Sequence, residues 1–353
     1  MGRRLIRRVF GAAVTALAAD LMATVPAAAV DETAILAKRP PEQLSAFGFF
    51  ADAAAQLPAE GVLPFAPATP LFTDFAEKRR FVYMPEGKSA GYDEEEAFHF
   101  PVGAALIKTF AYPDDSEDGL HLVETRVLLH QESGWQAWAY VWNEDQSEAE
   151  LNIAGAKIGM EIPLPDGGVK AITYAVPNKN QCKGCHAING AVTPIGPKAR
   201  NLNHGFDYGE GTENQLARWI GTGLLTGAPQ PADAPSVPDW LDETAPLDAR
   251  ARAWLDINCA HCHRREGPAS NSGLFLTWSE KDQTAYGINK RPVAAGRGSG
   301  GLHVDIAPGK PEESILLYRV VSDEPGVMMP ELGRSLTDPR AVELLRDWIS
   351  SLN

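Results

Sequence analysis

The chain is short of cysteine, of positive charge and of long apolar runs, and each shortage excludes a class of protein. Its 353 residues include only four cysteines, too few for a disulfide-rich secreted scaffold. Lys and Arg number 32 against 46 Asp and Glu, and the formal net charge is −14 at pH 7. Such an acidic chain is a poor partner for nucleic acid or for anionic membranes.

Residues 1–29 have the pattern of a secretion signal. Four arginines precede an Ala-rich apolar stretch, and the small residues up to Ala29 offer a cleavage site. Asp20 interrupts the apolar stretch, which disfavours a transmembrane anchor. No later run approaches about 18 uninterrupted apolar residues. We therefore expect cleavage near Ala29, export to the periplasm or beyond, and no membrane span in the mature chain.

All four cysteines fall in two C-x-x-C-H motifs, Cys182-Lys-Gly-Cys185-His186 and Cys259-Ala-His-Cys262-His263. This is the attachment signature of c-type haem. Cysteines three residues apart on a helical turn face the same way, so each thiol can add to one vinyl group of the porphyrin. The following histidine then lies beneath the iron as its proximal ligand.

A zinc site or a thiol redox site would fit these cysteines less well. The paired motifs of a zinc site usually stand about 15–20 residues apart and need no histidine after each pair. A thioredoxin-like redox site needs one motif in a βαβ context. The sequence therefore predicts two covalently bound haem c groups. The predicted attachment residues are Cys182, Cys185, Cys259 and Cys262, and the predicted iron ligands include His186 and His263.

The second motif lies in a region with the pattern of a cytochrome c domain, residues 247–353, preceded by a Pro-rich linker at 229–246. Apolar residues at helical spacing predict a helix at 247–258 that leads directly into Cys259. A second helix is predicted to begin at Pro339, because Asp338 and Pro339 form a helix start signal. Two such helices packed together are the skeleton of single-haem cytochrome c domains.

Met329 is the predicted distal ligand of the second haem. It precedes Pro330 in a loop between the two predicted helices, and the proline restricts that loop. Met328 is the alternative ligand, and a core methionine is the commoner fate of this residue type. Ligation by Met and His raises the reduction potential of a haem.

The preceding half of the chain is predicted to be β-rich at residues 30–175, in a sandwich or small barrel. The predicted strands span Ala104–Tyr112, Glu124–His130 and Trp135–Trp142. No nucleophile–base arrangement is recognisable, so no catalytic residues are assigned. The whole chain is thus expected to be an α+β multidomain protein in which mainly helical haem domains follow the β-rich domain.

The first haem-binding segment, residues 176–228, is less typical of a cytochrome. Residues 178–182 have the pattern of a short loop rather than a long helix. No methionine lies between His186 and Met328, so the sixth ligand of the first iron is left open. The iron has either an open position, which would allow peroxide chemistry, or one of five ligands: Met160, His99, His121, His130 or His204.

Five strings carry a resemblance to a known family: residues 181–186, 195–203, 258–263, 296–301 and 328–334. Together they resemble a largely uncharacterised family of exported bacterial di-haem cytochrome c-like proteins, some of which are associated with parallel β-helix repeat proteins. The resemblance runs from about Pro70 to the C-terminus. It implies haem at both motifs and supplies no substrate.

These observations predict a periplasmic di-haem c-type cytochrome that transfers electrons to or from a redox protein partner. One alternative is a di-haem peroxidase-like enzyme that acts on peroxide at the first haem. The motifs of such enzymes generally stand further apart, and both halves are helical. Another alternative is a haem-bearing module whose β-rich domain binds carbohydrate or a protein.

Overall fold

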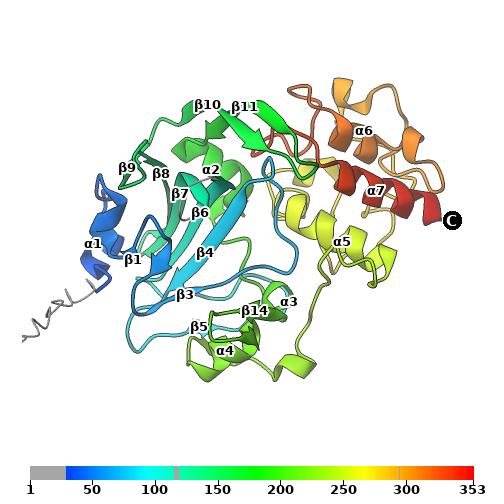
Figure 1. The fold of residues 1–353 in the computed structure, drawn as a ribbon. Coiled ribbons are helices and arrows are strands. Elements are labelled where there is room, and N and C mark those ends of the chain that lie inside the picture. The colour runs from blue at the N-terminus through cyan, green and yellow to red at the C-terminus, as the bar shows by residue number, and fades with distance from the viewer. Residues whose placement is uncertain (1–28, 115–118, 294) are drawn as a thin grey trace, which may run out of the picture.

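The computed structural model describes residues 29–114, 119–293 and 295–353. Residues 1–28, which contain the predicted signal peptide except for Ala29, lie outside this part of the chain. In Figure 1 the strand-rich half lies on one side and the C-terminal region on the other. The α-helices are α1 (Glu32–Leu36), α2 (Lys179–His186), α3 (Ala199–Leu202), α4 (Gln215–Gly221), α5 (Leu247–Asn258), α6 (Ile315–Val321) and α7 (Pro339–Ser351).

A six-stranded antiparallel sheet is the centre of the strand-rich half, in the order β3-β4-β6-β7-β8-β9. Its longer strands are rich in β-branched and aromatic residues, which suit a pleated and half-buried surface. The three strands predicted from the sequence are confirmed as β6, β7 and β8. The strands of the sheet are β3 (Val62–Pro64), β4 (Glu77–Tyr83), β6 (Ala105–Pro113), β7 (Leu120–Gln131), β8 (Gly134–Trp142) and β9 (Ala149–Leu151).

The expected sandwich or small barrel is wrong. Within the described residues the sheet is open, because its order runs from β3 to β9 without a pairing between these edge strands. The remaining strands form five two-stranded sheets. Their members are β1 (Phe50–Asp52) with β2 (Leu57–Pro58), β10 (Ala156–Pro163) with β11 (Val169–Val176), β12 (Ala187–Ile188) with β13 (Ala191–Val192), β14 (Gly205–Asp207) with β15 (Thr212–Asn214), and β5 (Ala90–Gly91) with β16 (Leu225–Thr226).

The two faces of the six-stranded sheet are covered differently. One face packs against α1 and the N-terminal loops, in a core that includes Phe47, Phe81 and Ile107. On the other face, the hairpin β10–β11 covers the end that carries Phe110. Residues 199–225 cover the opposite end, where Leu106 lies. The part of this face that lies between the two cores, around Lys108, shares a cavity with the first motif.

The C-terminal region has its own core, built from α5, α6, α7 and the loops around them. The predicted helix at 247–258 is confirmed as α5, and the helix predicted to begin at Pro339 is confirmed as α7. The Asp338 side chain caps α7 by accepting a hydrogen bond from the Arg340 backbone N–H.

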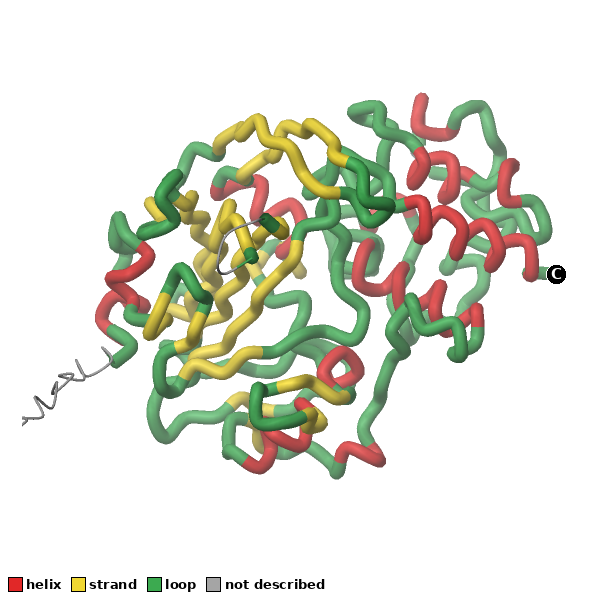
Figure 2. The backbone as a smooth tube through the Cα atoms, in the orientation of Figure 1, coloured by secondary structure: helices red, strands yellow, loops and turns green. Residues whose placement is uncertain are grey.

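The expectation of mainly helical haem domains is wrong. Between Asn258 and Ile315 the described residues contain no α-helix, only loops and single 3₁₀ turns. Figure 2 shows how much of this region is loop. Residues 176–228, which were expected to bind the first haem, also mix short helices with strand pairs. The protein as a whole is built mostly from strands and loops. A physical reason lies in composition, since the 27 prolines and 32 glycines of the chain interrupt helical periodicity.

Several polar contacts join the strand-rich half to the C-terminal region, and two of them centre on buried charged side chains. The buried carboxylate of Asp74 accepts hydrogen bonds from the backbone N–H groups of Ser335 and Leu336, at 2.7–2.8 Å. The buried guanidinium of Arg200 pairs with Asp256 of α5 at 3.0 Å. The two halves are therefore joined at more than one place. No helix in the described residues is long and apolar enough to cross a membrane.

Candidate haem-binding site

The first motif occupies α2, so the expectation of a loop at residues 178–182 is wrong. Asn178 caps the helix by accepting hydrogen bonds from the backbone N–H groups of Asn180 and Gln181. The Gln181 side chain in turn accepts from the Asn178 N–H, which completes a capping box. This local signal begins the helix at Lys179, ahead of Cys182. Cys182 and Cys185 consequently lie one turn apart on the same helix.

His186 ends α2 with its ring held in one orientation. Its Nδ1 lies 2.9 Å from the carbonyl oxygen of Thr193. Burial, followed by the positive charge of Lys108, lowers the pKa of His186 to about 4. The imidazole is therefore neutral near pH 7. A neutral ring whose Nδ1–H is bonded to a carbonyl leaves Nε2 as a ligand atom, which is the arrangement that orients metal-bound histidines.

The second motif begins where α5 ends, with Cys259 as the C-cap residue. His263 is oriented by Ser272, whose hydroxyl lies 3.3 Å from the histidine Nδ1. Burial lowers the pKa of His263 to about 4, so this imidazole is also neutral near pH 7. Both motif histidines thus have one ring nitrogen engaged by the protein.

A cavity of about 570 Å³ adjoins the second motif. Cys259, Cys262 and His263 line it, and so does Met329 from the loop before α7. Met328 does not line this cavity. Among the described residues, Met329 is the one methionine that lines a cavity beside either motif. The structure therefore brings together the four residues that the sequence assigned to the second haem.

The loop that carries Met329 is fixed by arginines. The Arg334 guanidinium is buried and donates to the Met329 carbonyl oxygen at 2.8 Å and to the Ser322 carbonyl oxygen at 2.9 Å. The Met329 N–H donates to the Arg319 carbonyl oxygen at 2.9 Å. Arg319 itself also lines the cavity. The methionine is thus held by its backbone at the wall of the cavity that contains His263.

A smaller cavity of about 200 Å³ adjoins the first motif. Cys182, Cys185 and His186 line one side of it. The six-stranded sheet lines another side and contributes charged side chains, including Lys108 and Arg126. Sequence reasoning missed these two residues, because nothing in the linear pattern says which face of β6 and β7 meets the motif.

None of the five ligand candidates proposed for the first haem lines either cavity. His130 and His204 instead hydrogen-bond backbone carbonyls at 2.9 Å, His99 lies beside Asp93, and His121 is exposed. Met160 packs against the core beneath the β10–β11 hairpin. The cavity beside the first motif is therefore lined by other residues than the ligand candidates that the sequence offered.

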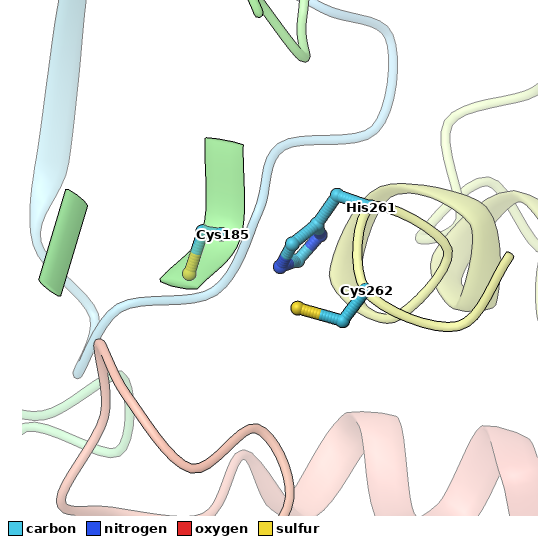
Figure 3. Close-up of side chains that lie close together, drawn as sticks. All are labelled: Cys185, His261 and Cys262. Atoms are coloured by element: carbon cyan, nitrogen blue, oxygen red, sulfur yellow. The ribbon is translucent and has the colours of Figure 1, made fainter. Parts of the chain in front are cut away.

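The two motifs meet at a junction formed by Cys185, His261 and Cys262 (Figure 3). The sulfur and nitrogen atoms of these side chains all lie within 4.8 Å of one another. His261 is only 7% exposed, lines both cavities, and has an Nδ1 atom without a hydrogen-bond partner. It occupies a variable position of its C-x-x-C-H motif, so the signature gave no reason to single it out.

The residues present fit covalent haem better than a bound metal ion. A zinc ion at the junction would take two sulfurs and one nitrogen, and would leave Cys182, Cys259 and both oriented motif histidines without a role. Two haems use every one of these residues. The second cavity falls within the range of about 300–1,000 Å³ that is usual for cofactor pockets, whereas the first is smaller.

No protein-family model, no curated protein and no solved structure matches this chain. The assignment of the site therefore depends on its own residues and their geometry.

Proposed function

We propose that this protein is a periplasmic di-haem c-type cytochrome that transfers electrons. The observation that carries the proposal is the meeting of both C-x-x-C-H motifs at one junction. A cavity adjoins each motif, Cys185 of the first motif lines both cavities, and Met329 lines the cavity beside the second motif. Haem bound at each motif would supply one-electron Fe(III)/Fe(II) chemistry.

The protein residues have distinct parts in this function. The four cysteines attach the two groups, and His186 and His263 each present one ring nitrogen, with the other engaged by Thr193 or Ser272. Because Cys185 and Cys262 lie together, the two groups would be neighbours. Electron transfer between neighbouring centres needs no moving part, so a rigid junction suits this function.

The proposal is tested on protein made with cytochrome c maturation machinery. Pyridine haemochrome analysis and intact mass should give two haems for the wild-type chain. The double variants Cys182→Ala/Cys185→Ala and Cys259→Ala/Cys262→Ala should each retain one. A wild-type protein that carries zinc and four free thiols would contradict the proposal and would favour a metal site at the junction.

One observation favours a second candidate, a di-haem peroxidase-like enzyme. The cavity of the first motif is lined by no methionine among the described residues, so an open coordination position is compatible with its walls. Rapid peroxide turnover by the two-haem protein, lost in Cys182→Ala/Cys185→Ala but kept in Met329→Ala, would favour the enzyme. Slow turnover in all three would favour electron transfer alone.

The proposed location and partner depend on the sequence pattern. Export before haem attachment agrees with the signal at residues 1–29, and cell fractionation of the tagged protein tests it. A redox protein with a basic surface suits the formal net charge of −14. Such a partner should exchange electrons more slowly as the salt concentration rises, because salt screens the attraction.

A further inference from the structure

Three cations stand in one row on the face of the six-stranded sheet that meets the first motif. Arg80 of β4 pairs in register with Lys108 of β6, and Lys108 pairs in register with Arg126 of β7. Side chains directly opposite on neighbouring strands lie about 4.5–5.5 Å apart at Cβ and point to the same face. All three line the first cavity. We call Arg80, Lys108 and Arg126 the cationic row.

Like charges directly opposite one another destabilise a sheet, so a compensating anion would stabilise this row. The protein supplies one carboxylate to it. Glu124, fully buried, accepts from Arg126 at 2.7 and 2.8 Å and also from the Tyr174 hydroxyl at 2.8 Å. This bidentate pair neutralises Arg126 and leaves the other two members of the row.

Lys108 and Arg80 have no carboxylate partner among the described residues. Arg80 donates only to the Lys78 carbonyl oxygen, at 3.2 Å. The Lys108 ammonium makes a cation–π contact with Phe110, 4.9 Å from the ring centroid, and Arg126 lies over the same ring at 4.3 Å. Burial, and then the charges of Arg126 and Arg80, lower the pKa of Lys108 to about 7. The row is therefore short of negative charge.

The cationic row is partly buried and lies between two apolar cores of the sheet. Along these strands it separates two apolar cores, one that contains Phe110 and one that contains Leu106. A sequence selected only for packing would place apolar side chains there. Exposed charge is instead kept on the opposite face of β4, where Arg79 is 54% exposed and lies beside Glu77.

We propose that the cationic row is a carboxylate-binding site whose natural occupants are the propionates of the haem attached at Cys182 and Cys185. Haem carries two carboxylates, and Lys108 and Arg80 are two cations that lack them. The inference rests on the proposed di-haem function. The same chemistry would bind a free dicarboxylate, so the test separates the two sources.

The test compares Lys108→Met and Arg80→Gln with the matched control Arg79→Gln, all in the two-haem protein. Removing a cation beside the first haem favours its Fe(III) state, so we expect the potential of that haem to fall in both row variants. The potential of the second haem is the internal reference and should not move. Arg79→Gln should leave both potentials unchanged. Equal potentials in wild type and row variants would overturn the proposal.

Thermal unfolding gives a second test. Lys108→Met should change the midpoint temperature in opposite directions in the two-haem protein and in the Cys182→Ala/Cys185→Ala variant. Lys108→Met should lower the midpoint temperature when the first haem is present. It should raise that temperature in Cys182→Ala/Cys185→Ala, where the row has no propionates and only repulsion is removed. The same sign in both backgrounds would contradict the proposal.

Succinate is the probe for a free anion. It should stabilise Cys182→Ala/Cys185→Ala and leave the two-haem protein unaffected, because propionates already fill the site. Stabilisation of the two-haem protein would overturn the propionate source. A wild-type protein without covalent haem would instead contradict the proposed function, and haemochrome analysis of the same sample distinguishes that failure. If Cys182→Ala/Cys185→Ala does not fold, the potentials of the row variants alone decide the question.

Discussion

The two cavities differ in the part of the molecule that completes each of them. The second is closed by a loop of its own region, which brings Met329 into the cavity of His263. The first is lined by the six-stranded sheet, which is distant in the sequence and brings the cationic row to the cavity of His186. The same five-residue signature therefore sits in two different chemical settings. Sequence motifs define attachment, whereas the surrounding fold sets the redox properties.

The largest expected effect comes from removing the methionine that distinguishes the second cavity. Met329→Ala should lower the potential of the second haem by a substantial part of the roughly 0.8 V over which axial ligands set haem potentials. The far-red band of Fe(III)–Met ligation should disappear from the oxidised spectrum. The first haem should be unchanged, as followed by spectroelectrochemistry.

Met328→Ala is the matched control for this change, because Met328 is the adjacent methionine and does not line the cavity. It should preserve both the band and the potential. If Met328→Ala removes the band and Met329→Ala does not, the ligand has been assigned to the wrong methionine.

The next largest effect concerns the buried ion pair between Arg200 of α3 and Asp256 of α5. Asp256→Asn should lower the free energy of unfolding by up to about 3–5 kcal/mol, because it removes the close, buried carboxylate partner of Arg200 and leaves only the half-exposed Glu95, at 3.7 Å. Denaturant titration measures this change. Glu42→Gln, which breaks an exposed pair with Arg39, should have no measurable effect. A small effect of Asp256→Asn would mean that the packing of α3 against α5 does not depend on this ion pair.

A smaller effect on stability is expected in acid. It concerns the ion pair between Glu96 of the strand-rich half and Arg264, the residue after His263. Burial raises the pKa of Glu96, but the hydrogen bond from Arg264 and the charges of Lys198 and Arg264 outweigh burial and hold this pKa at about 2. A carboxyl group with a depressed pKa contributes stability above its ordinary value of 4.5, and this contribution is lost as the pH falls towards 2.

The measurement is the stability of Glu96→Gln and wild type between neutral pH and pH 2. The difference between the two proteins should be present at neutral pH and should shrink progressively below pH 4.5. A constant difference across this range would show that Glu96 contributes through packing and not through its charge.

The sequence predicted local features well and the architecture poorly. Helix α5 and the start of α7 follow from apolar spacing and from Asp338–Pro339, and strands β6, β7 and β8 follow from β-branched and aromatic runs. These signals act over a few residues. The open sheet and the loop-rich C-terminal region depend on long-range packing, which a single sequence does not display.

The candidate site shows the same division. Both motifs and Met329 stand out in the sequence, because the spacing that haem attachment would need is fixed and the methionine stands beside a proline. Lys108 and His261 do not, since their positions depend on strand register and on the approach of two motifs far apart in the chain. Alternation along β6 was the one available signal. Lys108 lies on a face of this strand between Leu106 and Phe110, where an apolar residue would be expected.

The most direct test of the proposed di-haem electron transfer is a potentiometric titration of the wild-type protein, in which the optical spectrum monitors the oxidation state of each centre. A di-haem cytochrome with Met329 as a ligand should show two one-electron transitions at different potentials, with Fe(III)–Met ligation in the centre of higher potential only. Two identical centres, or a protein that takes up no electrons because it carries no haem, would contradict it.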